Sequence, residues 1–121
     1  MARAVADRLA DIARALDRIE RRLQVSAIVT SGDLDDESLS IVAWSLLTAG
    51  EAIKALPAEL TGRHRNVDWR GLAGLRDQLA HQYFRIDQTT VWKIVTYDLP
   101  ALRAAISAEL RGQSGSSNPG A

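Results

Sequence analysis

The stretch VADRLADIARALDRIERRL, residues 5–23, decides the fold class of this chain. Its apolar side chains recur at alternating steps of four and three residues, a spacing that places them along one face of an α-helix. These side chains are Val5, Leu9, Ile12, Leu16, Ile19 and Leu23. Most positions between them carry arginine or aspartate. The pattern therefore predicts an amphipathic helix that buries one face against the rest of the protein.

A second apolar stripe follows at the same period and ends at Pro57, which disfavours helical geometry in the residue before it. Its members are Leu39, Val42, Leu46, Ala49, Ile53 and Leu56. The acidic residues just before it, Asp33, Asp35, Asp36 and Glu37, suit the first turn of a helix, where free backbone N–H groups carry partial positive charge. We therefore expect two long helices before residue 60.

Two more helices are predicted after a polar loop at residues 61–67. Asp68 is a candidate N-cap for a helix with the face Leu72, Leu75 and Leu79. Gly71 and Gly74 lower helix propensity by about 1 kcal/mol each, which suggests that a neighbouring backbone packs closely there. Asp87 is a candidate cap for the fourth helix, and Pro100 predicts a kink or break near Asp98. The face of this fourth helix is Val91, Ile94, Val95, Leu102, Ile106 and Leu110.

These elements predict an all-α fold, an antiparallel up-down helical bundle, because no segment alternates polar and apolar residues and the links are short. A chain of 121 residues has room for one domain. We place that domain at residues 1–111 and expect the Gly- and Ser-rich residues 112–121 to form a disordered tail. Four apolar stripes leave some apolar surface uncovered in a monomer of this size, which favours a homodimer.

Composition excludes several classes of function. Fifteen Lys and Arg balance fifteen Asp and Glu, so no global field draws the chain to nucleic acid or to an anionic membrane. The absence of cysteine excludes a disulfide framework and a thiolate metal site. The two histidines, His64 and His81, lack helical ligand spacing, so we expect no metal and no cofactor. With no apolar run of about 20 residues and no leader pattern, a cytoplasmic protein is expected.

One segment, residues 63–85, is locally basic and is the candidate site for a polyanion. It holds five arginines against two aspartates: Arg63, Arg65, Arg70, Arg76 and Arg85 against Asp68 and Asp77. From charge alone, a solvated helix surface with ion pairs at i,i+4 is the more common explanation of such a pattern.

Within that segment, Arg76, His81 and Tyr83 stand close together in sequence. At about 100° per residue, Arg76 and Tyr83 fall about 20° apart on a helix, whereas His81 lies about 140° from Arg76. One straight helix cannot aim all three at one point. They converge only if the helix ends or distorts near His81, or if two copies of the motif face each other across a dimer cleft. From the residues alone, structural roles for His81 and Tyr83 remain open.

Several short elements, in order along the chain, closely resemble the HepT-like branch of the HEPN superfamily, from about Leu9 to Leu110. They are Gly50-Glu51-Ala52, the run from Trp69 to Asp77, His81-Gln82-Tyr83-Phe84, Val91-Trp92 and Asp98-Leu99-Pro100. The family signature, an arginine, four residues, a histidine, one residue and a tyrosine, is matched by Arg76, His81 and Tyr83. The residue after the arginine is commonly Asn or Asp in this family, and Asp77 fits.

This resemblance implies a HEPN-like helical homodimer that acts as the toxin of an MntA/HepT type II toxin–antitoxin system and cuts RNA without a metal. The two Arg-His motifs would line one cleft. His81 would exchange a proton with the ribose 2′-OH or the leaving oxygen. Arg76 would hold the phosphate, and Asp77 would support the site. The remaining arginines of the basic segment, Arg63, Arg65, Arg70 and Arg85, become candidates for RNA binding.

The same resemblance implies a rival interpretation. The usual partner of such toxins is a minimal nucleotidyltransferase antitoxin, which in some members adenylylates the motif tyrosine, here Tyr83. Three hypotheses therefore stand: a metal-independent endoribonuclease, a non-catalytic partner controlled by adenylylation, and a purely structural helical dimer. A basic face around Arg76 favours the first, an exposed Tyr83 hydroxyl the second, and a buried His81 the third.

Overall fold

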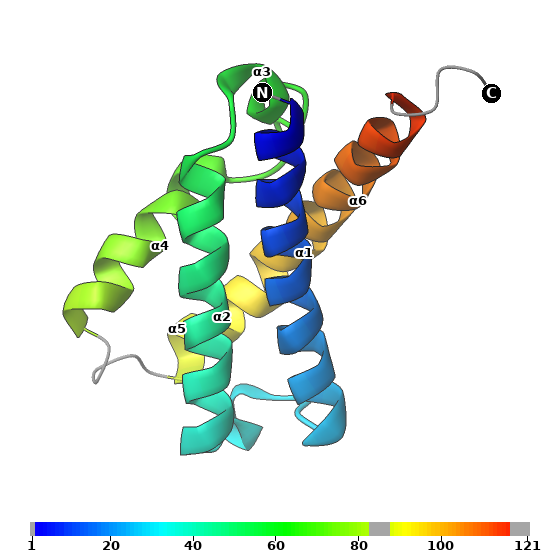
Figure 1. Ribbon diagram of the computed structural model, residues 1–121. Helices are drawn as coiled ribbons and strands as arrows, with labels where there is room; N and C mark the ends of the chain where they lie inside the picture. The colour runs from blue at the N-terminus through cyan, green and yellow to red at the C-terminus, as the bar shows by residue number, and fades with distance from the viewer. Residues whose placement is uncertain (1, 83–87, 117–121) are drawn as a thin grey trace.

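The computed structural model describes residues 2–82 and 88–116 of the chain, and in these ranges it contains helices and no strand, which confirms the all-α class. The two longest early helices, α1 (Ala2–Val25) and α2 (Asp36–Lys54), lie side by side and run in opposite directions (Figure 1). The short helix α3 (Ala58–Gly62) leads to α4 (Trp69–Gln82). The C-terminal part consists of α5 (Gln88–Lys93), a π-helical turn η3 (Ile94–Asp98) and α6 (Leu99–Ser116).

The core forms where the predicted apolar stripes meet. Leu9, Ile12, Leu16 and Ile19 of α1 are at most 2% exposed, and Val42, Leu46, Ala49 and Ile53 of α2 are buried against them and against α4. Leu102 and Ile106 of α6 are fully buried in the same cluster. The stripes predicted for these three helices are therefore confirmed at these positions.

A tight reversal joins α1 to α2. The Ile28 N–H donates to the Leu23 carbonyl at 2.9 Å and the Ala27 N–H donates to that of Gln24 at 3.1 Å, a Schellman arrangement that ends α1. Ala27 takes the left-handed conformation with φ 51, and Ile28 then enters the core at 5% exposure. After the short 3₁₀ turn η1 (Ser31–Asp33), Asp35 caps α2, because its Oδ1 accepts the Ser38 N–H at 2.7 Å.

Two expectations about the middle of the chain are wrong in part. Residues 61–67 are not all loop, since Thr61 and Gly62 close helix α3, which begins after Pro57 and buries Leu60. Helix α2 already ends at Lys54, and Pro57 lies in extended backbone as the N-cap of α3. No neighbouring backbone crowds the glycines of α4. A Cβ on Gly71 would meet the Asp68 carboxylate, and a Cβ on Gly74 would meet open space.

The predicted break near Asp98 is present as the π-helical turn η3. The Leu99 N–H bonds the Ile94 carbonyl five residues earlier, and Pro100 then lies in the first turn of α6, where its missing N–H needs no partner. Helix α6 runs to Ser116, so residues 112–116 of the expected tail are helical. A glycine inside a helix lowers its stability by only about 1 kcal/mol, which does not force an end at Gly112. Residues 117–121 and the proposed cap Asp87 lie outside the described residues.

Helix α4 lies at the edge of the fold. Its packing is against α2, from which it leans away along its length (Figure 1). Within the described ranges, no helix is both long enough and apolar enough to cross a membrane.

Candidate functional site

The beginning of α4, the helix that carries the sequence motif, is fixed by two local bonds. The Gly71 N–H donates to Asp68 Oδ1 at 3.0 Å, which confirms Asp68 as an N-terminal capping residue. The Trp69 indole N–H donates to the His64 carbonyl at 2.9 Å, and its ring packs on the core. The start of the motif helix is therefore held by both the preceding loop and the core.

Helix α4 is continuous through Arg76 and His81 and ends at Gln82. The five-residue separation thus keeps these two positions about 140° apart around the helix axis. The side chains of Arg76 and His81, and the whole of Tyr83 and Arg85, lie outside the described residues. Their roles stay predictions.

Asp77 is an exposed member of a link between α4 and α2. Its Oδ1 lies 3.6 Å from Lys54 Nζ, and its side chain is 63% exposed. Such a surface ion pair contributes roughly 0–1 kcal/mol to stability. The pair joins the two helices just beside the motif arginine in sequence, a placement compatible with the supporting role predicted for Asp77.

The three described arginines of the basic segment differ in availability. Arg63, the residue that follows α3, forms a two-point bond with Glu109 of α6, with nitrogen-to-oxygen distances of 2.8 and 3.1 Å. Arg65 and Arg70 are exposed. Arg63 would have to leave Glu109 to contact RNA through both nitrogens, whereas Arg65 and Arg70 present their side chains to solvent.

Glu109, which sequence reasoning did not single out, lies at the centre of a polar cluster. Besides Arg63 it contacts His64, whose Nε2 is 2.6 Å from Glu109 Oε2, and its side chain is only 11% exposed. The hydrogen bond from Arg63 holds the pKa of Glu109 below its ordinary value, with His64 acting in the same direction, although burial opposes both. The cluster ties the loop before α4 to α6. No sequence signal links residues 45 positions apart.

Asp98 lies in the π-helical turn and is the one described carboxyl whose pKa is raised. Burial is the main cause, and the negative charge of Asp68 adds to it. The Asp-Leu-Pro element and the cap of α4 are thus electrostatically coupled.

Comparison with known proteins places these features in a family. A model of the family described as "Ribonuclease HepT-like" matches residues 12–109, which is most of the chain and includes α2, α4 and η3. The chain belongs to the HepT-like ribonuclease family. No solved structure matches the chain.

Individual HepT-like relatives agree with this assignment. The chain is 34% identical to the "Probable ribonuclease HepT" of Thermococcus cleftensis over 85% of its own length and 93% of that protein. It is 36% identical to a "Putative RNase" of Caldanaerobacter subterraneus over 55% of its length and 60% of the relative. For a "Putative RNase" of Methanocaldococcus jannaschii the identity is 39% over 51% of each protein. The chain thus spans about half to three fifths of several of the relatives it matches.

The region matched by the HepT-like model contains the whole signature of Arg76, His81 and Tyr83. Within the described ranges, no three His, Asp or Glu side chains gather closely enough to hold a metal ion. The described residues show the structural framework around this motif. It consists of the capped start of α4, the ion pair that links α4 to α2, and the cluster around Glu109.

Proposed function

We propose that this HepT-like chain is a metal-independent endoribonuclease that acts in the cytoplasm as the toxin of a type II toxin–antitoxin pair. The observation that carries the proposal is the family match over residues 12–109, which contains the complete Arg-x4-His-x-Tyr motif. The names of the relatives, all ribonucleases by their printed description, support an RNA substrate.

In the proposed reaction the nucleophile is the ribose 2′-oxygen of the RNA itself. The neutral imidazole of His81 takes the 2′-OH proton while the oxygen attacks phosphorus, and the bond to the 5′-oxygen breaks. The leaving oxygen takes a proton from an imidazolium or from water. The products are a 2′,3′-cyclic phosphate and a 5′-hydroxyl. The Arg76 guanidinium offsets the charge that builds on the phosphate oxygens.

The active form in this proposal is a homodimer of antiparallel up-down bundles, with the two motif helices lining one cleft. Helix α4 supports it, because α4 packs on α2 and lies at the edge of the fold, where a second copy could reach it (Figure 1). A two-fold contact would bring each His81 toward the Arg76 of the partner copy and so overcome their divergence on one helix. Light scattering that shows a monomer at all concentrations would contradict this arrangement.

Cleavage in EDTA tests the chemistry. We expect His81→Ala and Arg76→Ala each to lower RNA cleavage by about a hundredfold or more and to relieve growth arrest. Helical content and oligomeric state should stay unchanged. Product ends should carry the cyclic phosphate. If the wild-type protein cleaves no RNA faster than the double variant does, the ribonuclease proposal fails.

A second candidate function is that of a substrate controlled by a nucleotidyltransferase antitoxin. It is favoured by the position of Tyr83, which directly follows the last residue of α4 and stands two residues after His81. An AMP group there would place a phosphodiester near Arg76 and compete with RNA for it. Incubation with the enzyme encoded beside this chain, ATP and Mg²⁺ should add AMP to the wild type and none to Tyr83→Phe. A stable inhibitory complex without any mass increase would show steric masking instead.

A further inference from the structure

The charged residues in the second half of α1 are divided between two sides of the helix. Asp17 and Glu20 face α6, where both accept hydrogen bonds from Arg103 at 2.7 to 2.9 Å. Arg18 and Arg22 instead lean toward α2, where their Nε atoms donate to Ser45 and Ser38. The surface between α1 and α2 therefore carries arginines of α1, although α1 as a whole has both acidic and basic side chains.

The surface between α1 and α2 contains a groove. It has a volume of about 300 Å³ and is lined by Arg18, Arg21, Arg22, Val25 and Ile41. Arg21 and Val25 are exposed, so the groove combines guanidinium groups with an apolar wall that is open to solvent. Two carboxylates partly offset the charge of Arg22. Glu37 lies 3.5 Å from it, and the pKa of Asp35 is lowered, mainly by hydrogen bonds from Ser38 and also by the charge of Arg22.

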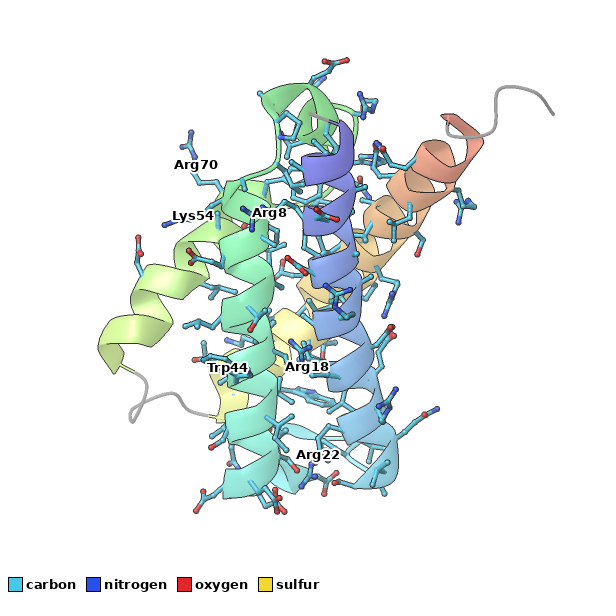
Figure 2. The ribbon with its side chains drawn as sticks, viewed as in Figure 1. Arg8, Arg18, Arg22, Trp44, Lys54 and Arg70 are labelled. Carbon is cyan, nitrogen blue, oxygen red and sulfur yellow. The ribbon has the colours of Figure 1, made fainter. Side chains whose placement is uncertain are left out.

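An exposed indole lies beside the groove. Trp44 is 59% exposed on α2, three residues after Ile41 and next to Ser45, the residue that holds Arg18. An indole exposed to this extent contributes little to the core, yet it offers a flat π-surface on the same face as the arginines. Figure 2 shows Trp44, Arg18 and Arg22 on one face of the α1–α2 pair.

The same face carries further cations toward the start of α4. Arg8, Lys54 and Arg70 appear on the side that Figure 2 presents, on α1, α2 and α4. Lys54 is paired with Asp77 of the motif helix. Further cations on α1, α2 and α4 therefore lie on the same side of the molecule as the groove.

The chemistry of the groove distinguishes between its conceivable occupants. A second copy that used the same surface would bring three arginines against three arginines around a two-fold axis, which is unfavourable. Duplex RNA keeps its bases stacked and offers none to an exposed indole. A single strand offers both phosphates for the guanidiniums and free bases for stacking, the combination that single-strand binding sites use.

We propose that the groove between α1 and α2, with Arg18, Arg21, Arg22 and Trp44, binds single-stranded RNA outside the motif. One base stacks on Trp44, and the flanking phosphates pair with the arginines. This inference rests on the proposed function for the identity of the ligand. The site would hold the strand that continues from the cleavage point, so it would contribute to binding and not to the chemical step.

Binding to uncleaved RNA provides the test. A labelled single-stranded oligonucleotide is titrated into the His81→Ala protein and followed by anisotropy, with Trp44→Leu, Trp44→Phe and Arg21→Gln introduced singly. We expect Trp44→Leu to weaken binding about tenfold and Trp44→Phe to recover most of the loss. Arg21→Gln should lower the slope of log K against log salt by about 0.7, the loss of one phosphate contact.

Arg111→Gln is the matched control, because it removes one exposed arginine from α6, away from the groove. It should leave the affinity unchanged. Binding that is equal for duplex RNA or heparin and indifferent to Trp44 would overturn the proposal, as would a groove that binds only an acidic protein. Cleavage by the wild type with unaltered binding in all groove variants would refute this site alone. Binding without any cleavage by the wild type would refute the proposed function alone.

Discussion

Glu109 is a largely buried carboxylate that bonds both Arg63 and His64, and its side chain is only 11% exposed. Its folded pKa is lowered, so the folded state favours the charged carboxylate, and the stability it contributes is present above the ordinary glutamate pKa. That contribution is lost as the pH falls through the lowered value.

We therefore expect Glu109→Gln to lower the free energy of unfolding by about 1–3 kcal/mol at neutral pH. The difference in the free energy of unfolding between this variant and the wild type should decrease as the pH is lowered. Urea unfolding across that pH range measures both quantities. Glu59→Gln serves as control, because Glu59 is 89% exposed and 3.7 Å from Arg63, and it should change little. A gap that stays constant with pH would show that Glu109 acts through packing alone.

At this scale the sequence allows some residues to be predicted and conceals others. Asp68 could be recognised as a cap, because a cap is defined by its neighbours within three positions, whereas Asp35, the cap of α2, was predicted only as one of four acids near the first turn. Glu109 could not, because its partners belong to a loop that only the folded chain brings to α6. Arg63 was recognised as basic, but its engagement by that carboxylate depends on the same tertiary contact.

At the scale of the helices, the two glycines of α4, Gly71 and Gly74, have different surroundings. Gly74→Ala should raise the free energy of unfolding by about 1 kcal/mol, because nothing lies within 4 Å of the added Cβ. Gly71→Ala should give no such gain, since its Cβ would displace the Asp68 carboxylate that caps the helix. Chemical denaturation of the two variants checks the contrast. An equal gain at both positions would mean that Asp68 can cap α4 from another rotamer.

The four predicted helical segments exist in the structure as far as it is described, because apolar periodicity reports the buried face of each helix. Helix α3 escaped prediction, because its five residues are too few for periodicity to register, and it buries one leucine, Leu60. The break at η3 could be predicted from Pro100, but its π-helical form could not, because five residues carry no periodic signal of their own.

At the scale of the whole molecule, a substitution of Leu46 tests whether the apolar stripes of the helices pack into one core. It is 2% exposed at the centre of α2, between α1 and α4. An unpaired carboxylate there should cost several kcal/mol against a total stability of roughly 5–15 kcal/mol. We expect Leu46→Asp to abolish the cooperative melting transition seen by circular dichroism. Leu79→Asp is expected to act alike, although that side chain lies outside the described residues.

Ser40→Asp is the control for Leu46→Asp, because Ser40 is exposed on the same helix. It should melt as the wild type does. A wild-type transition in Leu46→Asp would mean that α2 can rotate or unpack without loss of the fold, and the assignment of its buried face would then be wrong.

The separation of charge on α1 has a consequence for how the molecule behaves in bulk solution. The composition gives this chain a formal net charge of +0 and a pI near 6.7, so its average charge near neutral pH is close to zero. On α1, however, Arg18 and Arg22 lie on the α2 side, and Asp17 and Glu20, which share Arg103, lie on the α6 side, so we expect a transverse dipole. Retention on a cation-exchange resin slightly above the pI, where average charge predicts none, would be the chromatographic signature of that dipole.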